Sequence, residues 1–256
     1  MRKKRLVVKA GSLSVATENG HFRRNNKDIA EMLIYAKQEL GYQVALISSA
    51  AILIGRQKVS FDNGGDETTN LQTLAMVGQP RLHWKWQQAF GDELIVAQAL
   101  YDNRQFGAHT RDDVVKALLN TIGKKNVIAL INENDATTDA EIRIGDNDIL
   151  AGHVAKAIEA EHLIFLTTEE GVVDPDTKQV YRHLCPKDKG ILRRIDGKSG
   201  NEGGMHEKLK TAFDVCESVG TIVTIAHYRN SKVIAEVLDG EEKINGTQIL
   251  PQIKTA

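Results

Sequence analysis

The stretch NVIALINENDATTDAEIRIGDND, from Asn126 to Asp148, joins a short apolar run to a dense set of polar residues. The run NVIALI ends at Ile131 and has the length and β-branched content of a buried strand. Three arrangements would explain the polar residues that follow: a metal cage, an acidic surface loop, or a pocket for a small polar ligand. The set comprises six carboxylates and three amides, namely Glu133, Asp135, Asp139, Glu141, Asp146 and Asp148 with Asn132, Asn134 and Asn147.

Similar apolar runs recur along the chain and alternate with one-sided helical patterns. Helices are predicted from about Lys27 to Leu40, after Asn147 and after Gly204. Continuously apolar strands that alternate with amphipathic helices predict an α/β fold: a mainly parallel central sheet sandwiched between helix layers in three layers. Ligands of such folds bind at the carboxyl ends of the strands. The expected strands are Arg5 to Ala10, Gln43 to Ser48, Leu94 to Leu100, Val127 to Ile131, Leu163 to Thr168 and Thr221 to Ala226, all interpreted as buried.

Two polar, glycine-containing segments are predicted to be irregular: Val59 to Asn70, as a mobile loop or lid, and Lys187 to Glu202. Neither an internal repeat nor a linker interrupts the chain. We therefore expect a single domain, 1–256, whose part up to about Ala160 has a different role from the remainder.

Composition excludes several classes of partner. The 256 residues carry 33 Lys and Arg against 34 Asp and Glu, a net charge of −1, which provides no general attraction for nucleic acid or an anionic membrane. The two cysteines, Cys185 and Cys216, lie far apart in the sequence, as is typical of a reducing compartment. With no signal peptide and no apolar run long enough to span a membrane, a soluble, cytoplasmic protein is expected.

Two strand ends have the residues of an anion site. In VKAGS, Lys9 ends a strand and Gly11 allows backbone N–H groups to approach a phosphate. In SSAA, Ser49 precedes a helix whose N-terminus offers free N–H groups. The alternatives are a lysine at the sheet edge that extends to solvent and a serine that only caps its helix.

A third anion site is predicted in GNEGGMHEKL, where Gly203 and Gly204 open a helix with Lys208 one turn inside. Glycines, a helix dipole and a lysine together can hold a phosphate. The stretch is neither a P-loop nor a dinucleotide fingerprint. The alternative is a flexible loop before an amphipathic helix.

The polar stretch from Asn132 to Asp148 fits a ligand pocket better than a metal cage. It lacks the His and Cys that zinc sites use, and its order does not match a calcium-binding EF-hand loop. Carboxylates suit an ammonium group and amides suit a carboxylate, so an amino acid beside a nucleotide would fit.

Taken in order, the motifs VVKAGS, SSAA, AMVGQ (Ala75 to Gln79), INEND, IGDND (Ile144 to Asp148), LTTEEGVV (Leu166 to Val173) and NEGGMHEKL resemble those of the glutamate 5-kinases in the amino acid kinase family. The resemblance covers essentially the whole chain, as a kinase domain without the C-terminal PUA domain of many members. It implies ATP-dependent phosphorylation of the side-chain carboxylate of L-glutamate, the first step of proline biosynthesis. It also implies that Mg²⁺ is held mainly by the phosphates of ATP. The resemblance further implies that the protein forms a homo-oligomer, either a dimer or a tetramer. The alternatives are a glutamate-binding protein with weak or lost kinase activity and a family relative that acts on another acid or on a nucleoside monophosphate.

The resemblance also assigns roles to residues. It implies that Lys9, Lys208 and Asp148 are catalytic, with Asp148 organising the two lysines. It implies that glutamate binds at Ser49, Asp135 and Asn147, together with Asn134 and Gly11. The nucleotide would be bound by Lys9, Thr167, Thr168, Gly203, Gly204, Met205 and Lys208.

The departures from the family's motifs gather on the nucleotide side. Thr168 stands in place of an aspartate and Val173 in place of a tyrosine, while Glu202 and Glu207 replace two threonines. On the glutamate side, Ala50 replaces a glycine. We therefore expect an intact glutamate half and an altered nucleotide half.

Overall fold

The structure is a computed structural model that describes residues 4–60, 66–106, 111–137, 146–196, 204–230, 232–241 and 243–251. Among these residues, eight strands form one sheet in the order β3-β4-β2-β1-β5-β7-β8-β6. The strands are β1 (Arg5–Ala10), β2 (Gln43–Ser48), β3 (Ile95–Tyr101), β4 (Val127–Glu133), β5 (His162–Thr167), β6 (His183–Leu184), β7 (Ile222–His227) and β8 (Thr247–Ile249). Five adjacent pairs, from β3 to β7, are parallel, and β8 runs antiparallel to β7.

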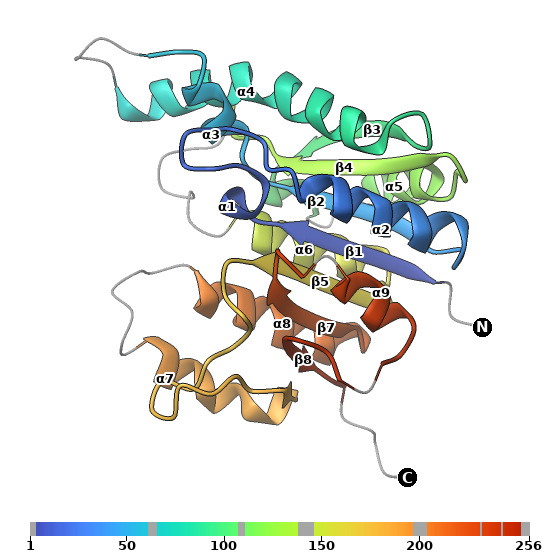
Figure 1. Ribbon diagram of the computed structural model, residues 1–256, viewed down its shortest axis with the longest axis vertical. Coiled ribbons are helices and arrows are strands. Elements are labelled where there is room, and N and C mark those ends of the chain that lie inside the picture. Colours follow the sequence, from blue (N-terminus) through green and yellow to red (C-terminus); the bar gives the residue numbers. More distant parts are fainter. Residues whose placement is uncertain are drawn as a thin grey trace.

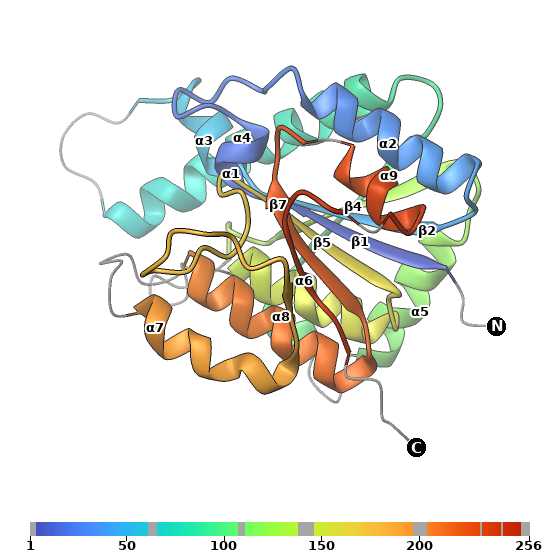
Figure 2. The same ribbon diagram turned by 60° about the horizontal axis from the view of Figure 1, so that its bottom comes forward.

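Helices cover both faces of the sheet, as Figures 1 and 2 show. The α-helices are α1 (Ser12–Val15), α2 (Asn26–Gln38), α3 (Ala51–Arg56), α4 (Glu67–Phe90), α5 (Arg111–Ile122), α6 (Asp146–Ala157), α7 (Leu192–Asp196), α8 (Met205–Val219) and α9 (Val233–Leu238). Two short 3₁₀ helices, Asn103–Phe106 and Pro186–Ile191, complete the described elements. The predicted α/β fold with a mainly parallel sheet between helix layers is confirmed.

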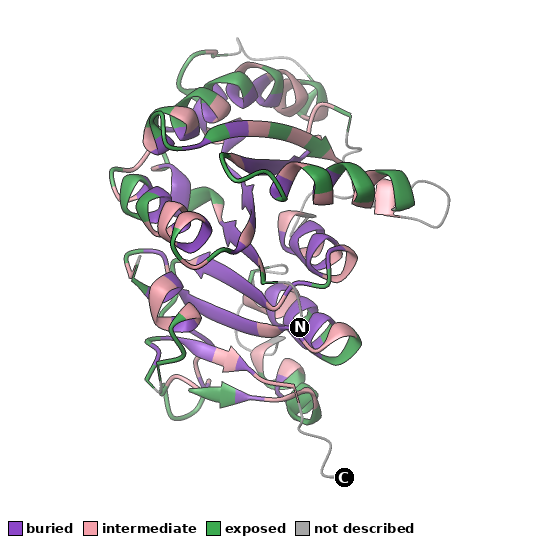
Figure 3. Cartoon of the chain, turned by 90° about the vertical axis from the view of Figure 1, so that its right-hand side faces the viewer, coloured by how far each residue is buried: buried purple, intermediate pink, exposed green. Residues whose placement is uncertain are grey.

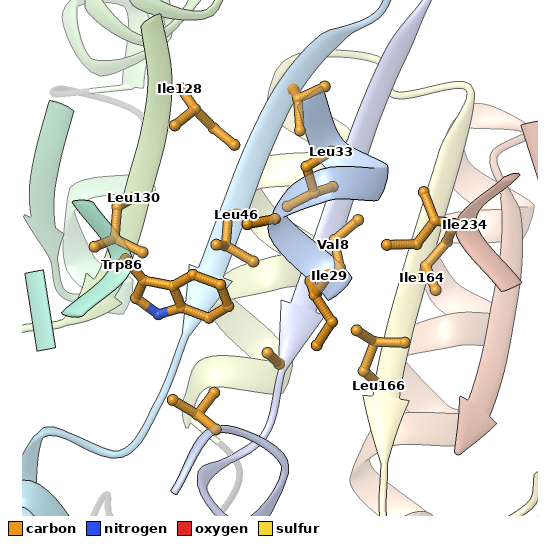
Figure 4. Packing of buried hydrophobic residues seen from close by; sticks show 14 of the residues in the cluster. Val8, Ile29, Leu33, Leu46, Trp86, Ile128, Leu130, Ile164, Leu166 and Ile234 are labelled. Atoms are coloured by element: carbon orange, nitrogen blue, oxygen red, sulfur yellow. The ribbon is translucent and has the colours of Figure 1, made fainter. Parts of the chain in front are cut away.

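The two faces of the sheet bury separate apolar clusters, because successive side chains of a strand point to opposite faces. From β1, Leu6 and Val8 join the cluster that includes residues of α2, α4 and α9, which Figure 4 shows in part. Val7 joins the cluster formed with α5, α6 and α8. By the same alternation, Lys9 belongs to the face that α6 and α8 cover. In Figure 3 the middle strands are buried along their length, while the outermost strands carry exposed segments.

Strand positions agree with the prediction to within two residues, but β3 was interpreted wrongly as a buried strand. It pairs with β4 alone among the described strands, and Ile95 and Leu100 are 56% and 37% exposed. A strand at the edge of a sheet is covered less fully than a central one. The apolar run alone could not reveal its place in the sheet order.

The two segments predicted to be irregular contain helices. Helix α4 begins at Glu67, and its N-cap Asp66 accepts a hydrogen bond from the Thr69 N–H, so only 61–65 of the first segment lie outside the described residues. The second segment holds a 3₁₀ helix and α7, and 197–203 lie outside the described residues. Side-chain capping and packing override a polar, glycine-containing composition here.

Helices α3 and α4 approach each other closely through two glycines. A Cβ at Gly78 would lie 1.8 Å from the Ala51 carbonyl oxygen, and one at Gly55 would lie 2.1 Å from the Leu74 carbonyl oxygen. Neither position can carry a side chain at this helix separation. This crossing places the end of AMVGQ beside the start of α3.

None of the helices within the described ranges combines the length and apolar character needed to cross a membrane.

Candidate active site

A buried cluster of two lysines and one aspartate lies at the carboxyl end of β1. Lys9 Nζ is 2.7 Å from Oδ1 of Asp148, and Lys208 Nζ is 2.6 Å from Oδ2 of the same carboxylate. Lys9 and Lys208 are each 7% exposed and Asp148 is 4% exposed. The explanation of Lys9 as an edge lysine extending to solvent is therefore wrong.

Three elements bring these side chains together. The pleat of β1 directs Lys9 toward the face covered by α6 and α8, and Asp148 and Lys208 lie in the first turns of those helices. Helix α8 begins at Met205, so Lys208 lies one turn inside it, as predicted. The starts of α6 and α8 meet beside the end of β1 on the left of Figure 1.

Two cations share one anion in this cluster, so it carries an excess positive charge. Burial alone would raise the pKa of Asp148, but Lys9 and Lys208 together hold it below its ordinary value. Burial lowers the pKa of Lys208, and Lys9 lowers it further, whereas Asp148 opposes both effects. An anion that enters the site would compensate the excess charge.

A chain of side-chain amides runs beside the lysine cluster. Asn147 Oδ1 accepts the Glu133 N–H at 3.1 Å, so its Nδ2 must be the donor to Asn132 Oδ1 at 2.9 Å and to Ser49 Oγ at 3.0 Å. Asn132 in turn donates to Gln79 Oε1 at 2.7 Å. Because a backbone N–H can only donate, it fixes the direction of the whole chain of hydrogen bonds.

Ser49 is set up as a hydrogen-bond donor. Its Oγ accepts from Asn147, so its own hydroxyl hydrogen is directed elsewhere. The neighbouring Ser48 Oγ accepts from Trp86 Nε1 at 2.8 Å and donates to the Ser49 carbonyl oxygen at 3.1 Å. The explanation of these serines as helix caps is wrong, because the N-cap of α3 is Ala50 and no side chain caps it.

A cavity of about 410 Å³ opens beside the cluster, between the end of β5 and the start of α8. Its lining includes Thr167, Thr168, Gly204, Met205 and Lys208, five of the residues assigned to the nucleotide. Gly203 lies outside the described residues. Gly11 has a φ of −70°, and a Cβ there would lie 3.6 Å from Lys9 Nζ, so glycine keeps the space over that ammonium group open.

Asn134 and Asp135 follow β4 and line a second cavity of about 400 Å³. Gln79 and Glu133 also line it, so the amide chain connects this cavity to Ser49 and Asn147. Two acidic residues of the polar stretch between Asn132 and Asp148, Asp139 and Glu141, lie outside the described residues.

Comparison with known proteins agrees with this geometry. A family model described as the amino acid kinase family matches residues 4–227. The chain belongs to the amino acid kinase family. Its relatives include the glutamate 5-kinase of a Thermoanaerobacter species, 33% identical over 98% of this chain and 68% of that protein. The glutamate 5-kinase of Aliivibrio fischeri is also 33% identical, over 96% of this chain and 68% of that protein.

Solved structures share the fold at lower identity. Giardia lamblia carbamate kinase bound to AMP-PNP is 18% identical, with a TM-score of 0.64 over 98% of this chain and 99% of that chain. The T. acidophilum isopentenyl phosphate kinase product complex is 13% identical, with a TM-score of 0.63 over 95% of this chain and 99% of that chain.

Some departures from the family's motifs line the cavity of about 410 Å³, the nucleotide cavity that the resemblance implies, and others do not. Thr168 and Val173 line it, and Glu169 brings a carboxylate to the lining beside Thr168. Glu207 does not line it, and its carboxylate lies 3.4 Å from Lys210 Nζ. Glu202 lies outside the described residues.

Gln79 was not predicted to have a role, and Asn132 was expected only as one of the three amides of the ligand pocket. Both are buried, at 9% and 1% exposure. Their places in AMVGQ and INEND, two stretches that resemble motifs of the family, could have indicated from the sequence that they have a role.

Proposed function

We propose that this protein is a glutamate 5-kinase, which transfers the terminal phosphoryl group of ATP to the side-chain carboxylate of L-glutamate. A carboxylate oxygen bonds to the γ-phosphorus as the bond from that phosphorus to the ADP oxygen breaks, which gives glutamyl 5-phosphate and ADP. The observation that carries the proposal is the buried cluster of Lys9, Lys208 and Asp148, between the nucleotide cavity and the amide chain.

This reaction requires no general base, because the nucleophile is already a carboxylate. Its barrier comes largely from bringing two anions together, so catalysis depends on alignment and on neutralisation of charge. Lys9 and Lys208 supply the positive charge, and their shared carboxylate holds both ammonium groups in place. Ser49 and Asn147 orient the amino acid, and Asp135 supplies a carboxylate for its ammonium group.

The residues fit ATP with Mg²⁺ carried mainly on its phosphates. The cavity beside Lys208 has room for a nucleotide, and α8 presents its N-terminus there. Both carboxylate oxygens of Asp148 already contact lysines, which leaves the metal to the phosphate oxygens. The metal supplies charge neutralisation when bound.

The proposal assigns the part of the chain up to about Ala160 to glutamate and the remainder to the nucleotide. The product would enter proline biosynthesis. A homo-oligomeric state, a cytoplasmic location and the absence of nucleic-acid partners stay predictions.

Trapping of the acyl phosphate with hydroxylamine tests the proposed function. Wild-type protein with MgATP should yield hydroxamate from L-glutamate, and much less from L-aspartate or N-acetylglutamate, which lacks a free ammonium group. Equal activity with N-acetylglutamate would refute the assignment of Asp135. Glutamate binding without hydroxamate would instead identify a binding protein of the same fold.

Replacement of either lysine by alanine should separate turnover from binding. Loss of several kcal/mol of electrostatic stabilisation predicts a fall in kcat of about two orders of magnitude for Lys9→Ala or Lys208→Ala. The KM for glutamate should change less. Lys210→Ala, at an exposed lysine two residues after Lys208 on the same helix, is the matched control. An unchanged kcat would remove that lysine from the mechanism.

A further inference from the structure

A third cavity, of about 420 Å³, lies outside the candidate active site and is strongly basic. It forms where the segment between α1 and α2 meets the residues after β7. It shares no lining residue with the nucleotide cavity. Its lining comprises Thr17, Phe22, Arg23, Arg24, Asn25, Tyr228 and Arg229.

Arg23 and Arg229 are both positioned against Tyr228, which is 4% exposed. Their guanidinium carbons lie 5.2 Å and 5.7 Å from the centre of its ring. Arg23 Nε donates to the Leu13 carbonyl oxygen at 2.7 Å, and Arg229 Nε donates to the Tyr228 hydroxyl at 3.3 Å. Each arginine therefore uses Nε to fix its own orientation.

The remaining donors of these arginines are available to a ligand. Within the described ranges, the terminal nitrogens of Arg23 and Arg229 make no hydrogen bond to protein, and no carboxylate lies within ion-pairing distance of either residue or of Arg24. A guanidinium group held through Nε presents its two terminal nitrogens as a fork that matches two oxygens of a phosphate. Three cations without a carboxylate repel one another, and an anion would relieve that repulsion.

We propose that this cavity binds a phosphate-bearing small molecule larger than a single phosphate ion. Its volume lies within the range of small-ligand sites, and Phe22 and Tyr228 supply apolar surface beside the charged groups. The Asn25 amide, which donates to the Tyr228 carbonyl oxygen at 3.5 Å, keeps the two segments of the cavity together.

An occupant of this cavity would act on the candidate active site through two hydrogen bonds, one between backbone groups and one from the Arg23 side chain. The Tyr228 N–H donates to the carbonyl oxygen of Thr167, which lines the nucleotide cavity, at 2.8 Å. The Arg23 side chain holds Leu13 in α1, directly after Gly11. We therefore expect the occupant to change nucleotide affinity, and only this expectation rests on the proposed function.

Calorimetric titration with sodium pyrophosphate at constant ionic strength tests the binding site. The titrations use the full chain with Lys208→Ala, because pyrophosphate would also enter an intact active site. We expect one saturable site per chain that Arg23→Gln or Arg229→Gln weakens at least tenfold. Arg193→Gln, an exposed arginine on α7, should leave affinity within twofold. Arg23→Lys keeps the charge without the fork and should give an intermediate loss.

Equal binding by all these variants, or no saturable binding, would overturn the proposal. Pyrophosphate that binds the otherwise wild-type chain but not the Lys208→Ala chain would place the anion in the active site, which also overturns it. For the connection to the active site, AMP-PNP is titrated into the Arg23→Gln and Arg193→Gln chains with and without pyrophosphate. A change in AMP-PNP affinity that depends on Arg23 supports the connection, and its absence refutes that part alone.

Discussion

Both polar atoms of the Asn147 side chain make hydrogen bonds, and the chain of hydrogen bonds continues through Asn132 to Gln79. The Gln79 Oε1 atom accepts from Asn132, which orients the Asn147 amide that donates to Ser49. In the proposed function, Gln79 is thus a positioning residue that acts on the amino acid through Asn132 and Asn147. Its own Nε2 is buried and makes no hydrogen bond within the described part of the chain.

Gln79→Met tests this positioning role, because methionine keeps the volume but removes the acceptor. Loss of one partner of a buried hydrogen bond costs about 1–3 kcal/mol. We expect the KM for glutamate to rise roughly tenfold while kcat changes less than about threefold. Gln98→Met, an exposed residue lining the same cavity, is the control. An unchanged KM would show that Asn147 keeps its orientation without Gln79.

Ala50 stores backbone strain at the start of α3. Its φ is +92°, in the left-handed region that favours glycine, and the family's motif has glycine at this position. From the sequence, the substitution is only a departure from the family's glycine on the glutamate side. The structure shows a cost in backbone conformation instead.

Ala50→Gly should therefore stabilise the protein. Relief of about 1–2 kcal/mol of strain equals or exceeds the entropy cost of about 0.5–1 kcal/mol for glycine, so the free energy of unfolding should rise by up to about 1.5 kcal/mol. Ala51→Gly, in the following helix, should lower it by about 1 kcal/mol. Urea denaturation of the three proteins measures both changes. A loss of stability in Ala50→Gly would show that the strain at Ala50 is smaller than the entropy cost of glycine.

At the scale of elements, the separation between α3 and α4 affects the geometry of the candidate active site. Gly78 precedes Gln79 and lies against the Ala51 carbonyl oxygen, so the separation of these helices sets the position of the amide chain. Gly78→Ala must push α4 away from α3. We expect a loss of about 1–3 kcal/mol in unfolding free energy, as in overpacked cores, with a raised KM for glutamate. Gly190→Ala, where a Cβ meets no atom within 4 Å, should be close to neutral. Equal stabilities for the two variants would contradict the rigid crossing.

At the scale of the whole molecule, the edge strand β3 is the expected site of self-association. Its outer side pairs with no described strand, and Leu100 lines a cavity with Met76, which is 57% exposed. An open strand edge beside exposed apolar side chains favours pairing with a second copy. Sedimentation velocity should show a concentration-dependent oligomer that Leu100→Glu or Met76→Glu weakens. Leu13→Glu, at a separate exposed leucine, should not affect it. Association that all three variants leave intact would place the interface elsewhere.

The sequence by itself determined the alternation of strands and helices, the carboxyl-edge location of the polar residues and the three residues of the lysine cluster. The first two follow from local periodicity, which carries its information within a few residues, and the lysine cluster follows from the resemblance of short motifs to those of the family. Only the tertiary structure decided which strand lies at the edge, that Ala50 has a positive φ, and that Gln79 reaches Asn147 through Asn132. Sheet order, helix separation and side-chain hydrogen bonds between distant segments depend on packing across the whole chain. The basic cavity has the same origin, because Arg23 and Arg229 are separated by most of the sequence and meet only through Tyr228.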